Sequence, residues 1–245
     1  MIGSKIPYKL QANSYKLTMR HGFLLVDKPF GPTSHDAVAI VRRTLKEKSI
    51  GHLGTLDPAA SGLLVLAVGK KALKVIELFS SLRKEYVAEV TFGAVSTTYD
   101  QEGVIEEIPR KAGWEIPDLP KVRNFLADHF TGKISQVPPA YSALHIDGVR
   151  AYQKAMRGEK VVMAGRQVEI DSVEIVDYTF PKLVLKVACG SGTYIRSLAH
   201  DLGDMLKCGG YLSALRRTSI AEWNVEEAKA PDKVDWANVI PLKEI

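Results

Sequence analysis

Apolar residues recur along the chain with two different periods, and each period predicts its own kind of element. Between residues 86 and 92 apolar and polar residues alternate, which predicts a strand buried mainly on one face. Between residues 38 and 45 the apolar residues are spaced by three and four, which predicts a helix that Thr33 or Ser34 can cap. The same spacing predicts a second helix over residues 193–206.

Shorter apolar runs that end at glycine, proline or other turn residues predict the remaining strands. They cover residues 23–26, 63–68, 168–178, 183–188 and 211–220. Helices are also expected over residues 70–79, 122–130 and 151–157, with a small helix near the C-terminus. Residues 51–62, 93–103 and 109–120 are expected to be loops or surface connections. Because strands and helices do not strictly alternate, the fold class is predicted to be α+β with a largely antiparallel sheet.

Composition and charge place the chain among folded globular proteins. Of its 245 residues, 46% are hydrophobic and 25% are charged, which suits one large domain or one domain with a small appendage. Lysine and arginine total 33 against 28 acidic residues, so the net charge of +5 fits a polyanionic partner without requiring one. Basic pairs occur at residues 42–43, 70–71, 83–84 and 216–217, and each pair alone is more commonly a solvated surface.

The cysteines and the apolar runs bear on the compartment. Cys189 and Cys208 lack the spacing of a zinc site or a disulfide framework, so a reducing compartment is expected, with Cys189 buried and inert. The longest apolar run, residues 63–68, is far shorter than the ~18 residues that a membrane-spanning helix needs. The sequence therefore predicts a cytoplasmic protein without a membrane partner.

The segment GHLGTLDPAASG, residues 51–62, is the first candidate for a site. Its glycines permit tight backbone paths and close approach of a ligand, and Pro58 forces Asp57 into an extended conformation. A loop that carries His, Thr and Asp between two apolar elements is a common place for a site. Asp-Pro is also a frequent turn dipeptide, so on spacing alone Asp57 is as well explained as a turn residue.

The segment CGSGTYIRSLAHDLG is the second candidate. Arg196 falls in the first turn of a predicted helix, where a cation is unfavourable for the helix dipole, so an acidic partner is expected, either a carboxylate or a phosphate. If Asp57 were that partner, the ion pair would lower the pKa of Asp57 and keep it ionised at neutral pH. The alternative is that the long Arg196 side chain reaches solvent.

Both candidate segments belong to a series of motifs. In chain order these are GFLLVDKPFGPTSHD, GHLGTLDPAASGLL, KEYVAEVTFG, QVPPAYSALHIDG and GTYIRSLAHDLG, followed by LRRT. From about Gly22 to Ile220 their order and spacing resemble the TruB family of pseudouridine synthases, which modify the T-loop uridine of tRNA. The resemblance implies the pseudouridine synthase catalytic fold, with a mainly antiparallel mixed sheet flanked by helices and loops. It also implies an isomerisation that needs no cofactor and no metal.

The resemblance implies roles for four residues of these motifs. Asp57 matches the catalytic aspartate, which in the family attacks either C1′ of the ribose or C6 of the uracil. Tyr86 matches the tyrosine that stacks on the target base and assists deprotonation at C5, and Arg196 matches the ion-pair partner of the aspartate. His52 matches the histidine that fills the gap left by the flipped uridine. Such a base must leave its stack before a side chain can reach it.

Other positions match less closely. Tyr194 and Leu215 match substrate-contacting positions of the family's pocket, although packing alone would explain Leu215. The loop STTYDQEG, residues 96–103, approximates a Thr/Asp-rich insertion of the family, and Asp100 is its best matched acid and a supporting site residue. His145 stands where the family usually has Lys, which puts one phosphate contact in doubt but not the chemistry.

The resemblance also sets the expected domain organisation. Residues 1–21 form a basic arm that is disordered or touches RNA, residues 22–220 form the catalytic domain, and residues 221–245 form a short C-terminal extension. Many bacterial relatives carry a C-terminal RNA-binding domain of the PUA type, for which this extension is too short. Affinity for the tRNA T-arm should then depend on the basic catalytic domain and be more sensitive to salt. No heptad pattern or self-pairing segment is seen, so a monomer is expected.

Three alternatives remain beside the tRNA synthase. A guide-RNA-type synthase of ribosomal RNA usually carries a PUA domain, so the short C-terminus argues against it. A non-catalytic module that binds or folds tRNA is disfavoured because Asp57, Tyr86 and Arg196 are all present. An Asp/His hydrolase built on His52 and Asp57 would lack both a metal cluster and a nucleophile elbow.

Overall fold

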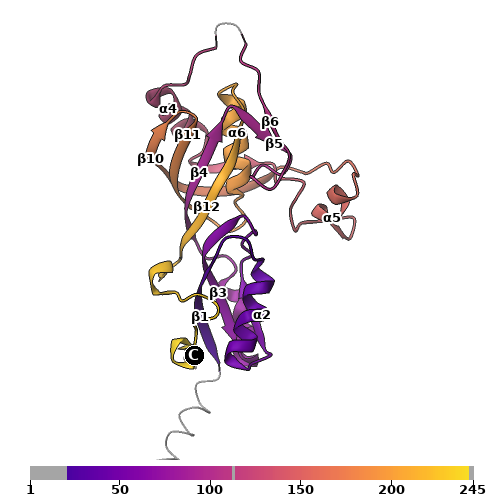
Figure 1. Cartoon of the computed structure of the whole chain (residues 1–245), viewed down its shortest axis with the longest axis vertical. Helices are drawn as coiled ribbons and strands as arrows, with labels where there is room; N and C mark the ends of the chain where they lie inside the picture. Colours follow the sequence, from indigo (N-terminus) through magenta and orange to yellow (C-terminus); the bar gives the residue numbers. More distant parts are fainter. Residues whose placement is uncertain (1–20, 112–113, 243–245) are drawn as a thin grey trace, which may run out of the picture. The chain divides into compact units, whose positions relative to one another are not determined.

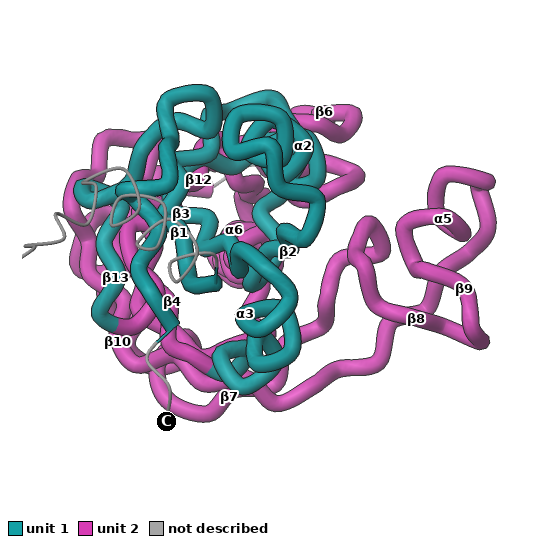
Figure 2. The backbone as a smooth tube through the Cα atoms, turned by 90° about the horizontal axis from the view of Figure 1, so that it is seen from below, with its two compact units in different colours: residues 1–81, 222–245 teal, residues 82–221 magenta. Residues whose placement is uncertain are grey.

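The computed structural model describes residues 21–111 and 114–242, so the arm predicted over residues 1–21 lies outside the described residues except for His21. The chain divides into two compact units, which Figure 2 colours separately. Unit 1 comprises residues 1–81 and 222–245, and unit 2 comprises residues 82–221. The strand pairs within both units are antiparallel, which confirms the predicted α+β class with a mainly antiparallel sheet.

The sheet of unit 1 is centred on two long antiparallel strands, β1 (Gly22–Lys28) and β3 (Ala60–Val68). The short strand β2 (Ile50–Leu53) pairs with β3, and β14 (Ile240–Pro241) pairs with β1. From Leu63 to Val68 every side chain of β3 is fully buried, as the continuous apolar run predicted.

Two helical segments complete the first part of unit 1. Helix α2 (Ser34–Leu45) buries Val38, Val41 and Leu45, so the predicted apolar face is confirmed. Helix α3 (Lys70–Val75) continues into a 3₁₀ turn, η1 (Ile76–Phe79), over the range predicted as one helix.

The C-terminal part of unit 1 is not the predicted small helix. It consists of β13 (Trp223–Asn224), the single 3₁₀ turns η2 (Val225–Glu227) and η3 (Trp236–Asn238), and β14. The polar groups of this segment form local turn bonds and also bond to distant backbone. The indole N–H of Trp236 donates to the Leu45 carbonyl at 3.2 Å, and the Lys229 backbone bonds to strand β1. Pairing with distant elements therefore interrupts the run of local bonds that a continuous helix would need.

The sheet of unit 2 runs in the order β12-β4-β11-β10-β7. These strands are β12 (Gly210–Ile220), β4 (Lys84–Phe92), β11 (Lys182–Cys189), β10 (Arg166–Thr179) and β7 (Gly132–Gln136). The even positions of β4 are buried and the odd positions are half-buried, which confirms the alternation read from the sequence. Side chains that stand opposite each other on β4 and a neighbouring strand lie on the same face of the sheet.

Helices cover this sheet and smaller elements extend from it. Helix α6 (Ile195–Met205) packs on β12, and α4 (Leu119–His129) packs on β10. A Cβ atom at Gly203 of α6 would lie 2.2 Å from the backbone nitrogen of Gly210, so this contact requires glycine. Helix α5 (Ala151–Met156) stands on a segment that projects away from the sheet of its unit (Figures 1 and 2).

Among the described residues, four other short strands form two pairs, of which the first lies in or beside residues 93–103, a stretch predicted as a loop. They are β5 (Ala94–Ser96) paired with β6 (Ile105–Glu107), and β8 (His145–Ile146) paired with β9 (Val149–Arg150).

The loop predictions over residues 51–62 and 93–103 were therefore too long. Strand β2 includes the start of the first stretch and β3 begins at Ala60, which leaves residues 54–59 as the loop. In these short segments the pairing partner supplies the ladder hydrogen bonds, and a polar composition does not prevent it.

Candidate active site

Asp57 lies in unit 1, in the loop between β2 and β3. Its side chain is half-buried, and its carbonyl oxygen accepts a hydrogen bond from the Ala60 N–H at 3.0 Å. On the preceding side, the Ser34 hydroxyl donates to the Leu56 carbonyl at 2.8 Å and accepts from the Leu56 N–H at 2.9 Å. On the following side, the Gly31 N–H donates to the Pro58 carbonyl at 2.9 Å. The loop is thus fixed on both sides of Asp57.

The segment before α2 supplies these anchors because its own geometry is fixed. Thr33 and Asp36 form a capping box, in which each side chain accepts a hydrogen bond from the other residue's backbone N–H. The hydrogen bonds from Thr33 lower the pKa of the Asp36 carboxyl. The buried Lys28 ammonium donates to the carbonyls of Pro29 and Pro32 at 2.9 and 2.7 Å, which holds the turn between β1 and α2.

His52 lies in β2, opposite Leu66 of β3, in the same unit as Asp57. Its ring meets the ring of His35 edge to face, with centroids 5.2 Å apart and planes at 88°. Sequence reasoning missed His35, although it stands beside the helix cap in one of the motifs. The pair brings an imidazole from α2 and one from β2 together within unit 1.

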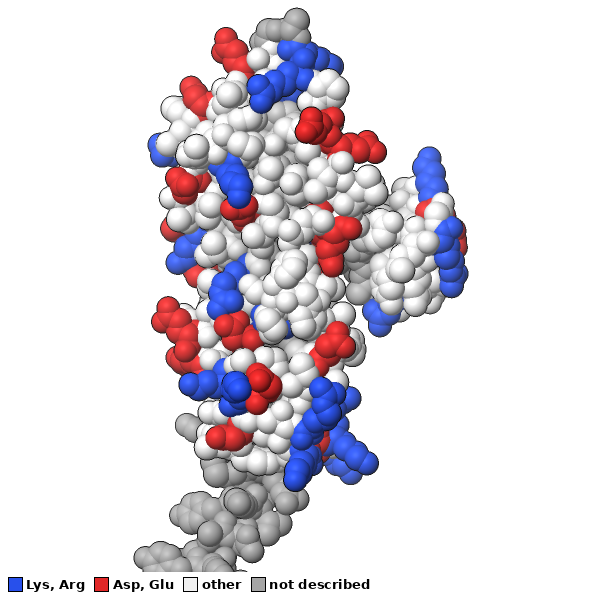
Figure 3. Space-filling view, in the orientation of Figure 1, with Lys and Arg blue, Asp and Glu red and all other residues white. Residues whose placement is uncertain are grey.

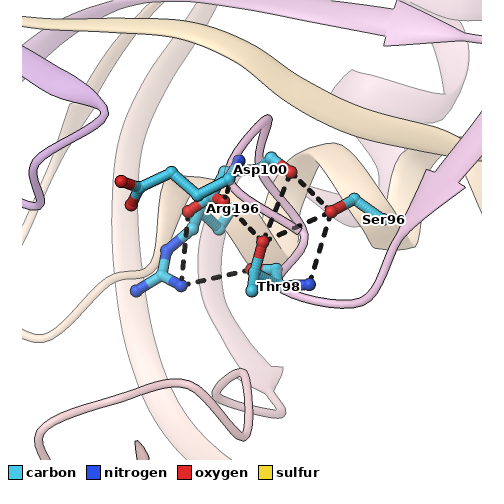
Figure 4. A network of polar contacts seen from close by, with 5 residues as sticks. Ser96, Thr98, Asp100 and Arg196 are labelled. Atoms are coloured by element: carbon cyan, nitrogen blue, oxygen red, sulfur yellow. Dashed lines mark hydrogen bonds and ion pairs between the residues drawn. The ribbon is translucent and has the colours of Figure 1, made fainter. Parts of the chain in front are cut away.

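Arg196 and Asp100 are brought together within unit 2. The guanidinium Nη1 lies 3.5 Å from Asp100 Oδ2 and donates to the Thr98 carbonyl at 3.2 Å, as Figure 4 shows. The two side chains are only 8% and 5% exposed. The expected acidic partner of Arg196 is therefore confirmed, and the alternative that Arg196 reaches solvent is wrong. A pairing of Arg196 with Asp57 would join residues of different units, and it stays a prediction.

The loop around Asp100 is ordered by its own side chains. Asp100 Oδ1 accepts from the Thr98 hydroxyl at 2.5 Å and from the Glu102 N–H at 3.0 Å. The Tyr99 ring stacks on the His200 ring of α6, with centroids 3.8 Å apart and planes at 6°. Loop and helix therefore fix the position of the carboxylate that faces Arg196.

Burial shifts the titration of the groups that line this stack. It raises the pKa of the Tyr99 hydroxyl and lowers that of His200. Burial, together with the neighbouring Asp204, raises the pKa of Asp201 to about 6. Loss of solvent thus disfavours the charged form of each group.

Tyr86 and Leu215 lie on neighbouring strands of unit 2. Tyr86 in β4 is 8% exposed and stands opposite Arg217 of β12, while the half-buried Leu215 stands opposite Ala88. Arg217 is itself only 1% exposed. The interpretation of residues 216–217 as a solvated surface pair is therefore wrong for Arg217, because its strand position turns the side chain to the buried face.

Another buried cation lies two positions before Tyr86 on β4. Lys84 is 9% exposed and its ammonium donates to the Leu82 carbonyl at 2.6 Å. Burial, and then the charge of Arg217, lower the pKa of Lys84. The pair at residues 83–84 is thus only partly a surface pair, whereas the pairs at 42–43 and 70–71 are exposed as expected.

Tyr194 precedes α6 and is held through its backbone. Its N–H donates to Gln136 Oε1 at 2.8 Å, and its carbonyl accepts from Gln136 Nε2 at 2.9 Å. The Arg166 guanidinium lies over its ring, 4.7 Å from the centroid. Gln136 comes from the QVPPA motif, so the structure joins two motifs that are distant in sequence. The predicted site residues thus gather as His52 with Asp57 in unit 1, and the other five in unit 2.

Two general features of the described residues concern membrane-spanning helices and metal sites. Between residues 21 and 242, apart from 112 and 113, no helix is long and apolar enough to cross a membrane. The same residues contain no group of three or more His, Cys, Asp or Glu arranged for a metal ion.

Two solved structures share the fold of this chain. The chain of an archaeal box H/ACA Nop10–Cbf5 complex matches 91% of this chain with a TM-score of 0.62 and 27% identity. A Cbf5–Nop10–Gar1 complex matches 90% with a TM-score of 0.66 and 28% identity. This chain spans 54% of the matched chain in both structures.

Sequence comparison identifies the family. The model described as TruB family pseudouridylate synthase, N-terminal domain, matches residues 42–195. A protein of Trichormus variabilis named tRNA pseudouridine synthase B is 44% identical over 84% of this chain and 70% of its own length. One of the same name from Opitutus terrae is 39% identical over 91% and 90%. The chain belongs to the TruB family of pseudouridylate synthases, which confirms the resemblance seen in the motifs.

Proposed function

We propose that the protein converts a uridine in the T loop of tRNA, of the type at tRNA position 55, into pseudouridine. The observation that carries the proposal is the Asp57 loop, in which hydrogen bonds fix the backbone on both sides of a half-buried carboxylate. A carboxylate acts as a nucleophile only when it is ionised and positioned. The relatives named tRNA pseudouridine synthase B support tRNA as the substrate.

The reaction is an isomerisation in which no electron is gained or lost overall. In one route, an Asp57 oxygen bonds to C1′ while the C1′–N1 bond breaks and uracil leaves with the electron pair. The uracil then turns, C5 bonds to C1′ as the Asp57–C1′ bond breaks, the C5 proton leaves and N1 gains a proton. In the other route Asp57 adds to C6 across the C5–C6 double bond, the C1′–N1 bond breaks and C5 bonds to C1′. Loss of the C5 proton then re-forms the double bond as Asp57 leaves C6, and N1 gains a proton. Both routes require the same carboxylate and the same loss of the C5 proton.

The remaining site residues, which lie in unit 2 apart from His52, are proposed to bind the uracil and to supply a positive charge. We propose that Tyr86 stacks on the flipped uracil, which contributes roughly 1–3 kcal/mol, and assists the C5 deprotonation. Tyr194 and Leu215 contact the base, and His52 fills the space that the flipped uridine leaves in the RNA. Arg196, held by Asp100 and the Thr98 carbonyl within unit 2, is proposed as the cationic site residue that the resemblance assigns to this position.

Exposed cations supply surfaces for the RNA backbone. Figure 3 shows Lys and Arg side chains along the outer edge of the segment that carries α5, and others over α2. On the α5 segment Arg150, Arg157 and Lys160 are exposed, and on α2 Arg42 and Arg43 are exposed. Such cations neutralise phosphates without reading sequence. We propose a monomer that binds the T-arm in the cytoplasm.

The test is to incubate the protein with unmodified tRNA transcripts and to map pseudouridine, beside an Asp57→Asn variant and a transcript whose target uridine is cytidine. We expect one modified T-loop uridine with the wild-type protein and none with the variant. Absence of pseudouridine with the wild-type protein would refute the proposed activity, and persistent activity of the variant would refute the role of Asp57. Because Asn is nearly isosteric, tRNA binding should be kept.

The guide-RNA-type alternative has weaker support. The matched Cbf5 chains are 27% and 28% identical to this chain, against 44% and 39% for the tRNA pseudouridine synthase B relatives. Modification of a bare tRNA transcript without added RNA or protein would separate the two activities.

A further inference from the structure

We propose that Ser34 is a positioning residue for the reaction, because its hydroxyl fixes the backbone immediately before Asp57. The inference rests on the proposed role of Asp57 as the nucleophile. Ser34 is the first residue of α2 and is 1% exposed, and Leu56 is 3% exposed. A single hydroxyl group takes up both backbone polar groups of Leu56, across 22 residues of sequence.

The geometry carries this bond directly to the nucleophile. The Leu56 carbonyl lies in the same rigid peptide plane as the Asp57 nitrogen and Cα. When Ser34 holds that carbonyl at 2.8 Å, it fixes the orientation of this plane. The bond from the Ala60 N–H to the Asp57 carbonyl fixes the next plane along the chain. With both flanking planes fixed, the direction in which the Asp57 side chain leaves the backbone is also fixed.

The anchor itself is rigid. The Thr33–Asp36 capping box sets the first turn of α2, so the Ser34 side chain has a defined starting point. A serine at this position is not needed for capping, because Thr33 already does that. Its full burial and its two bonds to a distant loop therefore point to the loop as the reason for the hydroxyl.

The consequence is a kinetic effect without a loss of RNA affinity. In Ser34→Ala both Leu56 groups lose this partner, and the Asp57 loop can move while the exposed RNA-contacting surfaces stay unchanged. A misplacement of about 1 Å of a reacting group costs up to roughly 100-fold in rate. We expect kcat on a tRNA transcript to fall about 10- to 100-fold, with KM within about threefold of wild type.

The matched control is Thr44→Ala, on the same helix. Its hydroxyl bonds the Ile40 carbonyl within α2 and does not reach the loop, so kcat should stay at the wild-type value. If Ser34→Ala keeps kcat within twofold of wild type, or loses activity only through KM, the inference is overturned. If that variant does not fold, Ser34→Cys decides, because a thiol keeps the volume but bonds weakly. We expect its kcat to fall at least about fivefold at unchanged KM, and a wild-type kcat overturns the inference.

Hydrogen exchange separates this inference from the proposed function. In the folded wild-type protein the Leu56 amide should be protected by the Ser34 oxygen, and in Ser34→Ala it should exchange at least about tenfold faster. Wild-type protein that makes no pseudouridine would refute the proposed function, while the exchange rates still report on the anchor. Active wild-type protein with unchanged exchange in Ser34→Ala would overturn the inference alone.

Discussion

Breaking the buried Asp100–Arg196 ion pair should strongly destabilise unit 2, and Asp100→Asn tests this. At 3.5 Å the attraction of two unit charges is about 5 kcal/mol at an effective dielectric constant of about 20. Removing one partner of a buried pair typically costs about 3–5 kcal/mol, because the remaining charge stays buried. Asn keeps an acceptor for Thr98 and Glu102, and Arg196 keeps its bond to the Thr98 carbonyl. We therefore expect the free energy of unfolding to fall by about 3 kcal/mol, the lower end of this range.

Urea denaturation followed by circular dichroism measures this loss as a change in the free energy of unfolding. The matched control is Glu169→Gln, which weakens the Arg83–Glu169 pair of the same unit. Its N···O distance is 2.8 Å, but its side chains are 49% and 46% exposed, so less than about 1 kcal/mol is expected. A loss below about 1 kcal/mol in Asp100→Asn, or an equal loss in both variants, would refute the reasoning from burial.

Two further predictions follow from groups whose pKa is raised by burial. The pKa of Asp201 is raised to about 6, so its contribution to stability is fully present below about pH 4 and is lost as pH rises through 6. The free energy of unfolding of Asp201→Asn should thus equal that of the wild type at pH 4 and exceed it by about 1 kcal/mol at pH 8, after allowance for partial exposure. Equal thermal stabilities at pH 8 would contradict this. Burial also raises the pKa of the Cys189 and Cys208 thiols to about 11. In a disulfide-exchange assay at pH 8 both should react at least about 100-fold more slowly folded than in urea, and rapid labelling of the folded protein would show that they are accessible.

The spacing of apolar residues was sufficient to predict the buried face of an element where burial follows a simple repeat. The apolar face of α2 and the alternation of β4 appeared where the spacing predicted them, because each element turns one face to the interior. The need of Arg196 for an acid also followed from its place in the first turn of α6. The identity of that acid did not, because Asp100 lies on a loop whose fold depends on Thr98, Tyr99 and α6.

Features set by distant partners could not be read from the sequence. Arg217 is part of a basic pair, and only the register of β12 against β4 shows that it lies beside Tyr86 on the buried face. The helix expected near the C-terminus is absent from the described residues because that segment bonds to β1 and α2. Likewise, the hydroxyl of Ser34 could cap a helix in sequence terms, but in the folded chain it holds Leu56.

We propose that Asp57 carries out the isomerisation of a tRNA uridine, and release of the C5 hydrogen is the most direct measure of that reaction. A tRNA transcript labelled with tritium at C5 of uridine should release tritium from one T-loop site when it is incubated with the wild-type protein. Asp57→Asn should bind the same transcript with similar affinity and release none. Release by the variant, or binding without release by the wild-type protein, would contradict the account.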